Sequence, residues 1–162
     1  MDELSWRAAL CPQEVAACDE RSGEKITNLR LHERSIRLGA HLIKEGLRPG
    51  DCIGILINNV VRALEVEWAT SRAGIERVSI DADNVYQVAS ILVDGRARAL
   101  LVESKYRGDI EKYLSSHSSN VNVFYVDGTA AREIADGYEW IVCYGEIDAC
   151  QQVLERARGV AT

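Results

Sequence analysis

Apolar positions recur along the chain with the periods of helices and short strands. Between residues 31 and 46 they fall every three or four positions, which predicts an amphipathic helix. The charged residues between them are predicted to face outward: Glu33, Arg34, Arg37 and Lys44. Turn-forming residues at 47–51 follow, and then comes a continuous apolar run at 52–57. Such a run is typical of a strand that is covered on both faces of a parallel sheet.

The same alternation of helix and strand patterns continues on both sides of this segment. Further helices are predicted at 5–18, 60–73, 85–92, 105–114 and 147–158, and further strands at 25–29, 77–80, 99–102, 121–126 and 140–144. Asn58 and Asn59 can cap the helix at 60–73, and Gly74 can end it. Helices that alternate with short apolar strands indicate β-α-β crossovers. The predicted fold class is α/β, a doubly wound and mostly parallel sheet with helices on both faces.

The composition fits a single domain. The chain has 162 residues, of which 47% are apolar, and this is enough to form one core. Its prolines are Pro12 and Pro49, and no Gly/Ser-rich linker divides it. We therefore predict one α/β domain over 1–162, with 1–23 as a possible N-terminal helical arm.

The charge balance is acidic. With 25 acidic and 19 basic residues the net charge is −6, which argues against nucleic acid and against a membrane surface as partners. No apolar run approaches the roughly 20 residues that cross a bilayer. Residues 1–6 also lack the basic and then apolar pattern of a secretion signal. The predicted location is cytoplasmic.

The cysteines predict neither disulfides nor a metal site. Five is an odd number, and a chain of this length folds without covalent cross-links, so reduced thiols are expected. Two pairs, Cys11 with Cys18 and Cys143 with Cys150, are separated by six residues, whereas zinc ligands usually stand two to four apart. Cys52 and Cys143, which fall on predicted strands, are interpreted as small buried side chains.

Motifs for phosphate binding and for a serine nucleophile are missing from the sequence. The glycines at 46, 50 and 54 lead into the strand at 52–57, in which Gly54 lies, whereas a nucleotide loop follows a strand. They are better interpreted as a helix stop, a turn and a close approach of two backbones. No G-x-S-x-G elbow is found.

The titratable side chains offer weak candidates. His32 and His41 lie nine positions apart on one predicted helix, too far to share one ion, and His117 falls in a serine-rich loop. A catalytic role for any of these histidines is the less favoured alternative. Residues two apart on a helix do not face each other, so Glu65 and Glu67 are interpreted as surface residues.

Asp81 and Asp83 are the best placed carboxylates. They follow the predicted strand at 77–80, at the end of the sheet where open α/β folds bind ligands. A helical pattern begins directly after them, so helix capping is favoured over ligand binding.

Taken in order, five segments resemble the opening of the AMP-binding, or acyl-CoA synthetase, superfamily. The segments are 24–27 (EKIT), 35–42 (SIRLGAHL), 46–59 (GLRPGDCIGILINN), 65–81 (EVEWATSRAGIERVSID) and 88–102 (VASILVDGRARALLV). Asn28 stands where an aromatic residue is usual in the family, and Ser79 stands where proline is common. The resemblance implies ATP-dependent activation of a carboxylic acid to an acyl-adenylate, followed by transfer to a thiol.

The family's phosphate loop, adenine segment, ribose-binding aspartate and mobile lysine have no counterpart in the sequence. We therefore assign no catalytic, cofactor-binding or metal-ligating residue, although ATP and Mg²⁺ are implied for a complete member of the family. The leading hypothesis is a non-catalytic N-terminal subdomain of such a ligase, with a scaffold or partner-binding role. The alternative is a free-standing, non-enzymatic interaction or regulatory module of that fold. A small enzyme that uses the sheet edge near Asn58 and Asp81 is the least favoured hypothesis. Self-association or a protein partner, either the remainder of a ligase or a carrier protein, is expected, because a partial sheet leaves apolar surface to cover.

Overall fold

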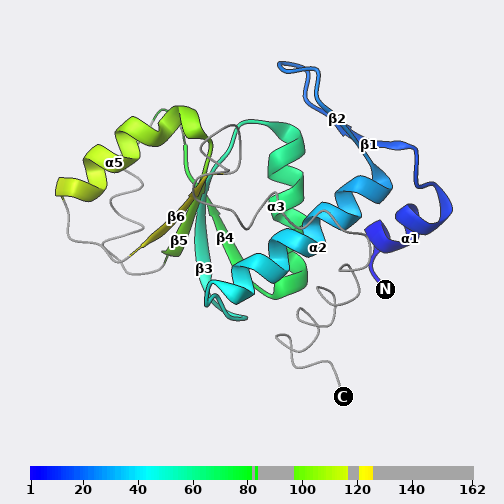
Figure 1. Cartoon of the computed structure of the whole chain (residues 1–162), viewed down its shortest axis with the longest axis horizontal. Helices are drawn as coiled ribbons and strands as arrows, with labels where there is room; N and C mark the ends of the chain where they lie inside the picture. The colour runs from blue at the N-terminus through cyan, green and yellow to red at the C-terminus, as the bar shows by residue number, and fades with distance from the viewer. Residues whose placement is uncertain (82, 84–96, 117–120, 126–162) are drawn as a thin grey trace. The chain divides into compact units, whose positions relative to one another are not determined.

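The computed structural model describes residues 1–81, 83, 97–116 and 121–125 (Figure 1). The described residues form two compact units. One, called here the helical unit, comprises 1–46 and 58–73, and the other, the sheet unit, comprises 47–57 and the described residues from 74 onward. The prediction of one domain over the whole chain stays a prediction.

The helical unit begins with a short helix and a β-hairpin. Helix α1 spans Glu3–Leu10, strand β1 Val15–Cys18 and strand β2 Lys25–Thr27. The predicted helix at 5–18 is therefore wrong beyond Leu10. A residue before proline disfavours the helical conformation, and Cys11 at the end of α1 has φ −133° and ψ 60°. The next apolar residues instead pair antiparallel with β2.

Helix α2 spans Asn28–Lys44 and starts three residues earlier than predicted. The cause is a cap: the hydroxyl of Thr27 accepts a hydrogen bond from the Arg30 N–H at 3.2 Å. The end agrees with the prediction, because Gly46 follows with φ +100°, the left-handed conformation that glycine adopts after a helix.

The predicted outer face of α2 is wrong for two of its charged residues. The exposed fractions of Glu33 and Arg37 are 1% and 4%, whereas Lys44 is exposed as predicted and Arg34 is half-buried. The helix packs against α1, α3 (Val60–Ala73) and both hairpin strands. Since neighbours surround α2 on several sides, positions that the sequence period assigns to solvent become covered.

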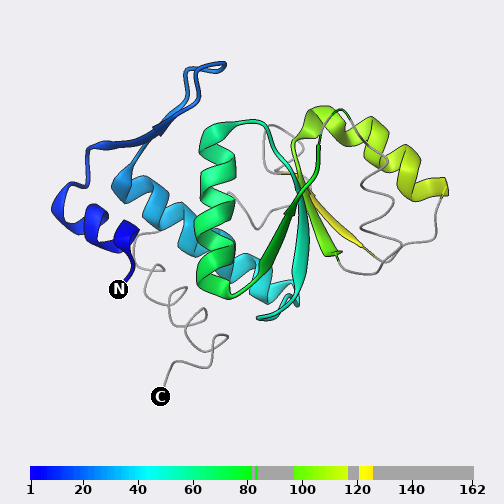
Figure 2. The same cartoon turned by 180° about the vertical axis from the view of Figure 1, so that it is seen from behind.

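Helix α3 has the predicted bounds, and its cap is the predicted one. The side-chain oxygen of Asn59 accepts from the Arg62 N–H at 3.1 Å, and Gly74 after the helix has φ +69°. Helices α2 and α3 lie side by side in both views (Figures 1 and 2). A buried core joins the parts of the unit, and it consists of Leu4, Ile26, Leu31 and Val61.

The sheet unit contains four parallel strands in the order β4-β3-β5-β6. Their bounds are Cys52–Leu56 for β3, Glu76–Ser79 for β4, Ala97–Val102 for β5 and Asn122–Tyr125 for β6. The α/β class and the parallel sheet are thus confirmed. Residues 99–102 of β5 are each 0% exposed, as expected for a strand that is covered on both faces.

A one-turn helix η1, Ser104–Tyr106, and helix α5, Arg107–Ser116, follow β5. Figure 1 shows α5 running beside the sheet. Its inward side chains share a core with the strands, composed of Leu56, Ile80, Leu100, Val102 and Ile110, with Tyr106, Leu114, Val121 and Val123 packed around it. The predicted helix at 105–114 and strand at 121–126 are confirmed within one or two residues.

The remaining predictions of secondary structure lie outside the described residues. They are the helices at 85–92 and 147–158 and the strand at 140–144. His117, Cys143 and Cys150 lie there too.

Gly54 is a point of close approach, but its neighbours are side chains and not the second backbone that was predicted. A Cβ atom at this position would stand 2.7 Å from Leu100 Cδ2 and 3.0 Å from Ile80 Cδ1. Both neighbours are core side chains, so we expect Gly54→Ala to lower the free energy of unfolding by about 1–2 kcal/mol through overpacking. Urea denaturation measures this.

Gly108 in α5 provides the matched control. A Cβ there meets nothing within 4 Å, and the position is helical. Gly108→Ala should therefore raise the free energy of unfolding by roughly 0.5–1 kcal/mol. Equal effects of the two substitutions would refute the close packing at Gly54.

Candidate functional site

The carboxyl ends of β3, β4 and β5 form the edge of the sheet where α/β folds place ligands. Two backbone hydrogen bonds extend the sheet to this edge: Ile80 N–H donates to Ile55 O at 2.7 Å and Glu103 N–H donates to Leu56 O at 3.1 Å. Asp81 and Glu103 therefore both lie at this edge of the sheet. The predicted position of Asp81 just past a strand is confirmed.

The side chains at this edge are tied to near neighbours. The carboxylate of Asp81 accepts from the Asp83 N–H at 3.0 Å and forms a local turn, whereas the helix that this pair was predicted to cap lies outside the described residues. Glu103 is 6% exposed, and its carboxylate lies 3.2 Å from the Lys105 ammonium. That ammonium also lies 5.0 Å from the centre of the Tyr106 ring. Glu103 was not among the predicted candidates, although a carboxylate directly after a buried strand was the available signal.

Lys105 is held as a cation. Desolvation acts to lower its pKa, but hydrogen bonds and charge interactions with Glu103 and Tyr106 together outweigh it, and the pKa of Lys105 lies above its ordinary value. A lysine in this state can attract an anion, but it is a poor proton acceptor at neutral pH. This edge therefore offers charge rather than a general base.

The helical unit contains a second polar cluster, centred on Arg72 of α3. This side chain is 7% exposed and binds the carboxylate of Asp2 with two hydrogen bonds, Nε to Oδ2 at 2.7 Å and Nη2 to Oδ1 at 2.9 Å. It also donates to Ser35 Oγ at 2.7 Å and lies 3.1 Å from His32 Nδ1. Asp2 at the same time caps α1 through the Ser5 N–H at 2.8 Å. One arginine thus joins α1, α2 and α3.

The ionisation states of Asp2 and His32 follow from this arrangement. Burial acts to raise the pKa of Asp2, but hydrogen bonds from Arg72 and Ser5 outweigh it and hold the pKa well below its ordinary value. Burial and the neighbouring Arg72 charge lower the pKa of His32, while Asp2 opposes them. Because arginine only donates, His32 Nδ1 accepts here, which fixes a neutral ring with its proton on Nε2.

Stability should fall as the pH drops below 6.5. A lowered pKa means that the folded state resists protonation of His32, so its contribution is complete above the ordinary value of 6.5 and decreases below it. His41, whose pKa burial also lowers, adds to the same loss. The contribution of Asp2 persists to more acid pH, since it is present above 3.8 and disappears only as the pH falls through the depressed pKa.

The measurement is the urea midpoint between pH 8 and pH 5 for the wild type and for His32→Asn. The Asn side-chain oxygen can accept from Arg72 as Nδ1 does but does not titrate. We expect the midpoint of the variant to fall less than that of the wild type. Parallel curves would mean that His32 does not contribute to the pH dependence.

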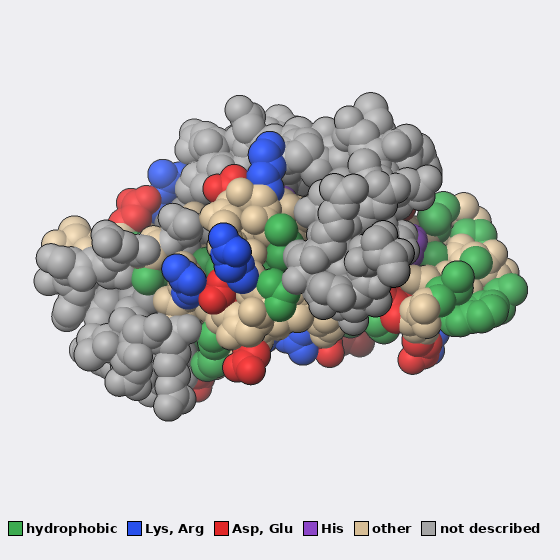
Figure 3. Space-filling model, turned by 90° about the horizontal axis from the view of Figure 1, so that it is seen from below, with side chains coloured by type: hydrophobic (Ala, Val, Ile, Leu, Met, Phe, Trp, Pro, Cys, Tyr) green, Lys and Arg blue, Asp and Glu red, His purple; other side chains and the backbone are tan. Residues whose placement is uncertain are grey.

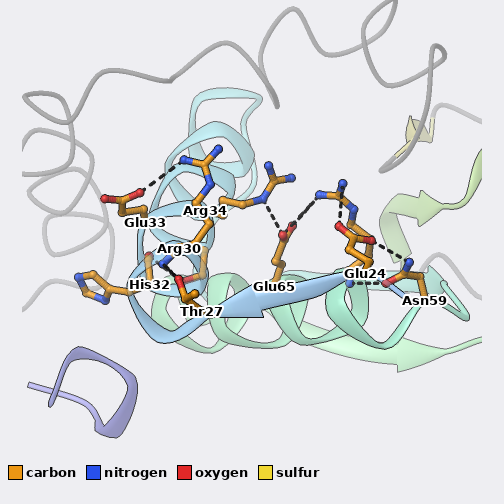
Figure 4. A network of polar contacts seen from close by, with 10 residues as sticks. Glu24, Thr27, Arg30, His32, Glu33, Arg34, Asn59 and Glu65 are labelled. Atoms are coloured by element: carbon orange, nitrogen blue, oxygen red, sulfur yellow. Dashed lines mark hydrogen bonds and ion pairs between the residues drawn. The ribbon is translucent and has the colours of Figure 1, made fainter. Parts of the chain in front are cut away.

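A third polar cluster surrounds Glu65 of α3 and is drawn in Figure 4. Glu65 is 0% exposed, so its interpretation as a surface residue is wrong, whereas Glu67 is exposed as predicted. The carboxylate of Glu65 accepts from Arg34 Nε at 2.6 Å and from Arg62 Nη1 at 3.4 Å. Arg62 also pairs with Glu24 at 3.4 Å. The cluster connects α2, α3 and the hairpin.

The other histidine and the cysteines stay apart from these clusters. His41 is buried, with Nδ1 4.0 Å from Glu45 Oε1, while His32 contacts Arg72. Cys11 and Cys52 are half-buried and Cys18 is exposed, and all three are free thiols. Among the described residues, no three His, Cys, Asp or Glu side chains are grouped as metal ligands. Nor does any helix in the described part of the chain have the length and apolarity to cross a membrane.

A comparison with known protein families identifies the family of the chain. A model of the AMP-binding enzyme family matches residues 4–145, which is most of the chain. The chain belongs to the AMP-binding enzyme family. Its predicted resemblance to acyl-adenylate-forming ligases is thereby confirmed.

The chain is also similar to a curated relative and, in fold, to two solved structures. The chain is 29% identical over 122 residues, 74% of its length, to the 3-oxocholest-4-en-26-oate–CoA ligase of Rhodococcus rhodochrous. The long-chain-fatty-acid–CoA ligase of Archaeoglobus fulgidus superposes on 83% of the chain with a TM-score of 0.70 at 22% identity. The o-succinylbenzoate–CoA synthetase of Bacillus subtilis, in complex with ATP and magnesium ion, superposes on 78% with a TM-score of 0.62 at 22% identity. At such identities the two structures show the shared fold alone.

The chain spans only part of these AMP-binding relatives. It covers 22% of the curated CoA ligase, and 29% and 33% of the two solved chains.

Proposed function

We propose that this AMP-binding family chain is the N-terminal subdomain of an ATP-dependent, carboxylate-activating ligase, and that it has a scaffold role and is not catalytic alone. The match over residues 4–145 carries the proposal, together with the order of the motifs that resemble the opening of the family. The parallel sheet and the two polar clusters of the helical unit supply a rigid framework. The complete ligase would use ATP and Mg²⁺ to join a carboxylate to AMP, releasing pyrophosphate, and would then transfer the acyl group to a thiol.

The charges of the described residues support a structural role. Adenylation needs cations or N–H donors that are directed at the phosphates of ATP. Four cations are instead bound to carboxylates of the chain itself: the buried or half-buried Arg34 and Arg62 to Glu65 and Arg72 to Asp2, and the exposed Lys105 to Glu103. Each of these pairs would have to break before its cation could bind a triphosphate.

Two measurements on the purified 162-residue chain test the proposal. We expect no ATP–pyrophosphate exchange with a panel of carboxylic acids, and no saturable MgATP binding in titration calorimetry at millimolar nucleotide. A complete CoA ligase, assayed in parallel, is the positive control. Exchange activity, or tight magnesium-dependent binding of ATP by this chain, would refute a purely structural role.

One observation favours the alternative of a free-standing interaction module. Helix α1 exposes 55% of Trp6 and 72% of Leu10, a surface that suits a protein partner. In either role we propose a cytoplasmic location, which the free thiols of Cys11, Cys18 and Cys52 support.

A further inference from the structure

Helix α1 has an apolar inner side and a second, exposed side. Leu4 and Ala8 are 2% and 7% exposed and attach the helix to its unit. Trp6 and Leu10, four positions apart and therefore on one side, are 55% and 72% exposed. Figure 3 shows hydrophobic side chains gathered at the end of the view where α1 lies. Large exposed apolar side chains that stand together mark an interaction surface.

The exposed side also carries a pair of opposite charges. Glu3 Oε1 and Arg7 Nη2 lie 2.6 Å apart and are largely exposed. Positions 3, 6, 7 and 10 follow the i, i+3, i+4, i+7 spacing of one helix stripe. We call these four residues the α1 face: Glu3, Trp6, Arg7 and Leu10. The face has no net charge in a chain whose net charge is −6.

We propose that the α1 face joins two copies of this chain through an antiparallel pair of α1 helices. The four positions are arranged symmetrically about the midpoint between Trp6 and Arg7. A two-fold axis at this midpoint brings Trp6 opposite Arg7 of the second copy, and Arg7 opposite Trp6. A guanidinium over an indole ring is an attractive contact. Leu10 then lies beside the same indole and shields it from water.

The charges of the α1 face favour a second copy of the chain over other binding partners. In an isologous interface every contact occurs twice, so a surface that carries both the cation and its aromatic partner complements itself. A lipid or nucleic-acid surface would require a net positive face, which α1 lacks. The helix spans only eight residues, so the area that one helix face can bury is below the roughly 800 Å² per partner of a standard interface. The association is therefore weak and reversible, and it does not depend on the chain's role in ligase chemistry.

Sedimentation velocity on the full chain, from low micromolar to several hundred micromolar, tests this interface. We expect the weight-average sedimentation coefficient of the wild type to rise with concentration. Leu10→Glu places a like charge in both halves of the interface and should weaken association about tenfold or more. Ala9→Glu adds the same charge to the same helix outside the α1 face, at an exposed position, and should leave association unchanged.

Two substitutions of Arg7 separate the proposed contact from helix stability. Arg7→Lys keeps a cation for the indole and should retain association within about threefold, whereas Arg7→Glu removes it and should abolish association. Circular dichroism of each variant verifies that α1 remains folded. If Leu10→Glu unfolds the protein, Trp6→Gln replaces it as the variant that tests the interface. A wild type that stays monomeric throughout, or a dimer that Leu10→Glu and Trp6→Gln leave intact, would overturn the proposal.

Discussion

Replacing Glu65 with alanine is expected to destabilise the protein by about 3 kcal/mol, the lower end of the roughly 3–5 kcal/mol for breaking a buried ion pair. The side chain of Glu65 is 1% exposed, and it neutralises Arg34 at 2.6 Å and Arg62 at 3.4 Å. Without the carboxylate these two guanidinium groups repel each other. Since their side chains remain 18% and 16% exposed, water offsets part of the loss and the lower end of the range applies.

Glu67→Ala is the matched control for Glu65→Ala. The two glutamates stand two positions apart on α3, but Glu67 faces solvent. Its replacement should change the free energy of unfolding by less than about 0.5 kcal/mol. Urea denaturation of both variants with the same buffer and probe gives the comparison. If the two variants are equally stable, Glu65 does not hold the helices together.

The contrast between Glu65 and Glu67 shows which structural features can be predicted from the local sequence. Helix α3 was predicted with its observed bounds, because its cap, Asn59, and its stop, Gly74, are adjacent to it in sequence. The burial of Glu65 depends on Arg34, which lies 31 positions away. Nothing in the local pattern distinguishes a glutamate that faces an arginine on another helix from one that faces water.

The same limit explains the other errors. The residues of β1 continue the helical spacing that predicted a helix at 5–18, but they form a strand by pairing with Lys25–Thr27 farther along the chain. Glu33 and Arg37 lie at positions that an isolated α2 would expose. In contrast, the buried strands β3 and β5 were predicted from their continuous apolar runs, which need no knowledge of the partner strand.

The local sequence likewise predicts only some of the polar contacts at the candidate sites. The place of Asp81 at the carboxyl end of β4 follows from local sequence, and so does its turn with Asp83. The Arg72 cluster does not, because Asp2 and Arg72 are separated by 70 positions. Long-range ion pairs of this kind are a property of the folded chain, and they join segments that have no shared sequence signal.

The second large effect is expected at Arg72. Arg72→Ala should lower the free energy of unfolding by about 3–4 kcal/mol, because it removes both hydrogen bonds to Asp2 and one to Ser35 from a buried position. The Asp2 side chain is 33% exposed, which keeps the effect below the upper limit for buried pairs. Arg72→Lys keeps the charge but cannot form the two-pronged contact, so we expect a loss of about 2 kcal/mol.

Arg107→Ala tests whether burial, rather than distance, gives Arg72 its effect. Arg107 Nε lies 2.7 Å from Glu111 Oε1, the same separation as Arg72 Nε from Asp2 Oδ2, but both side chains are exposed, at 42% and 58%. An exposed pair on one helix contributes about 0.3–0.5 kcal/mol. Arg72 also lies 5.5 Å from the centre of the Trp68 ring, so the tryptophan emission of Arg72→Ala should shift while that of Arg107→Ala should not. Equal losses of stability in the two variants would mean that the Arg72 cluster does not hold α1, α2 and α3 together.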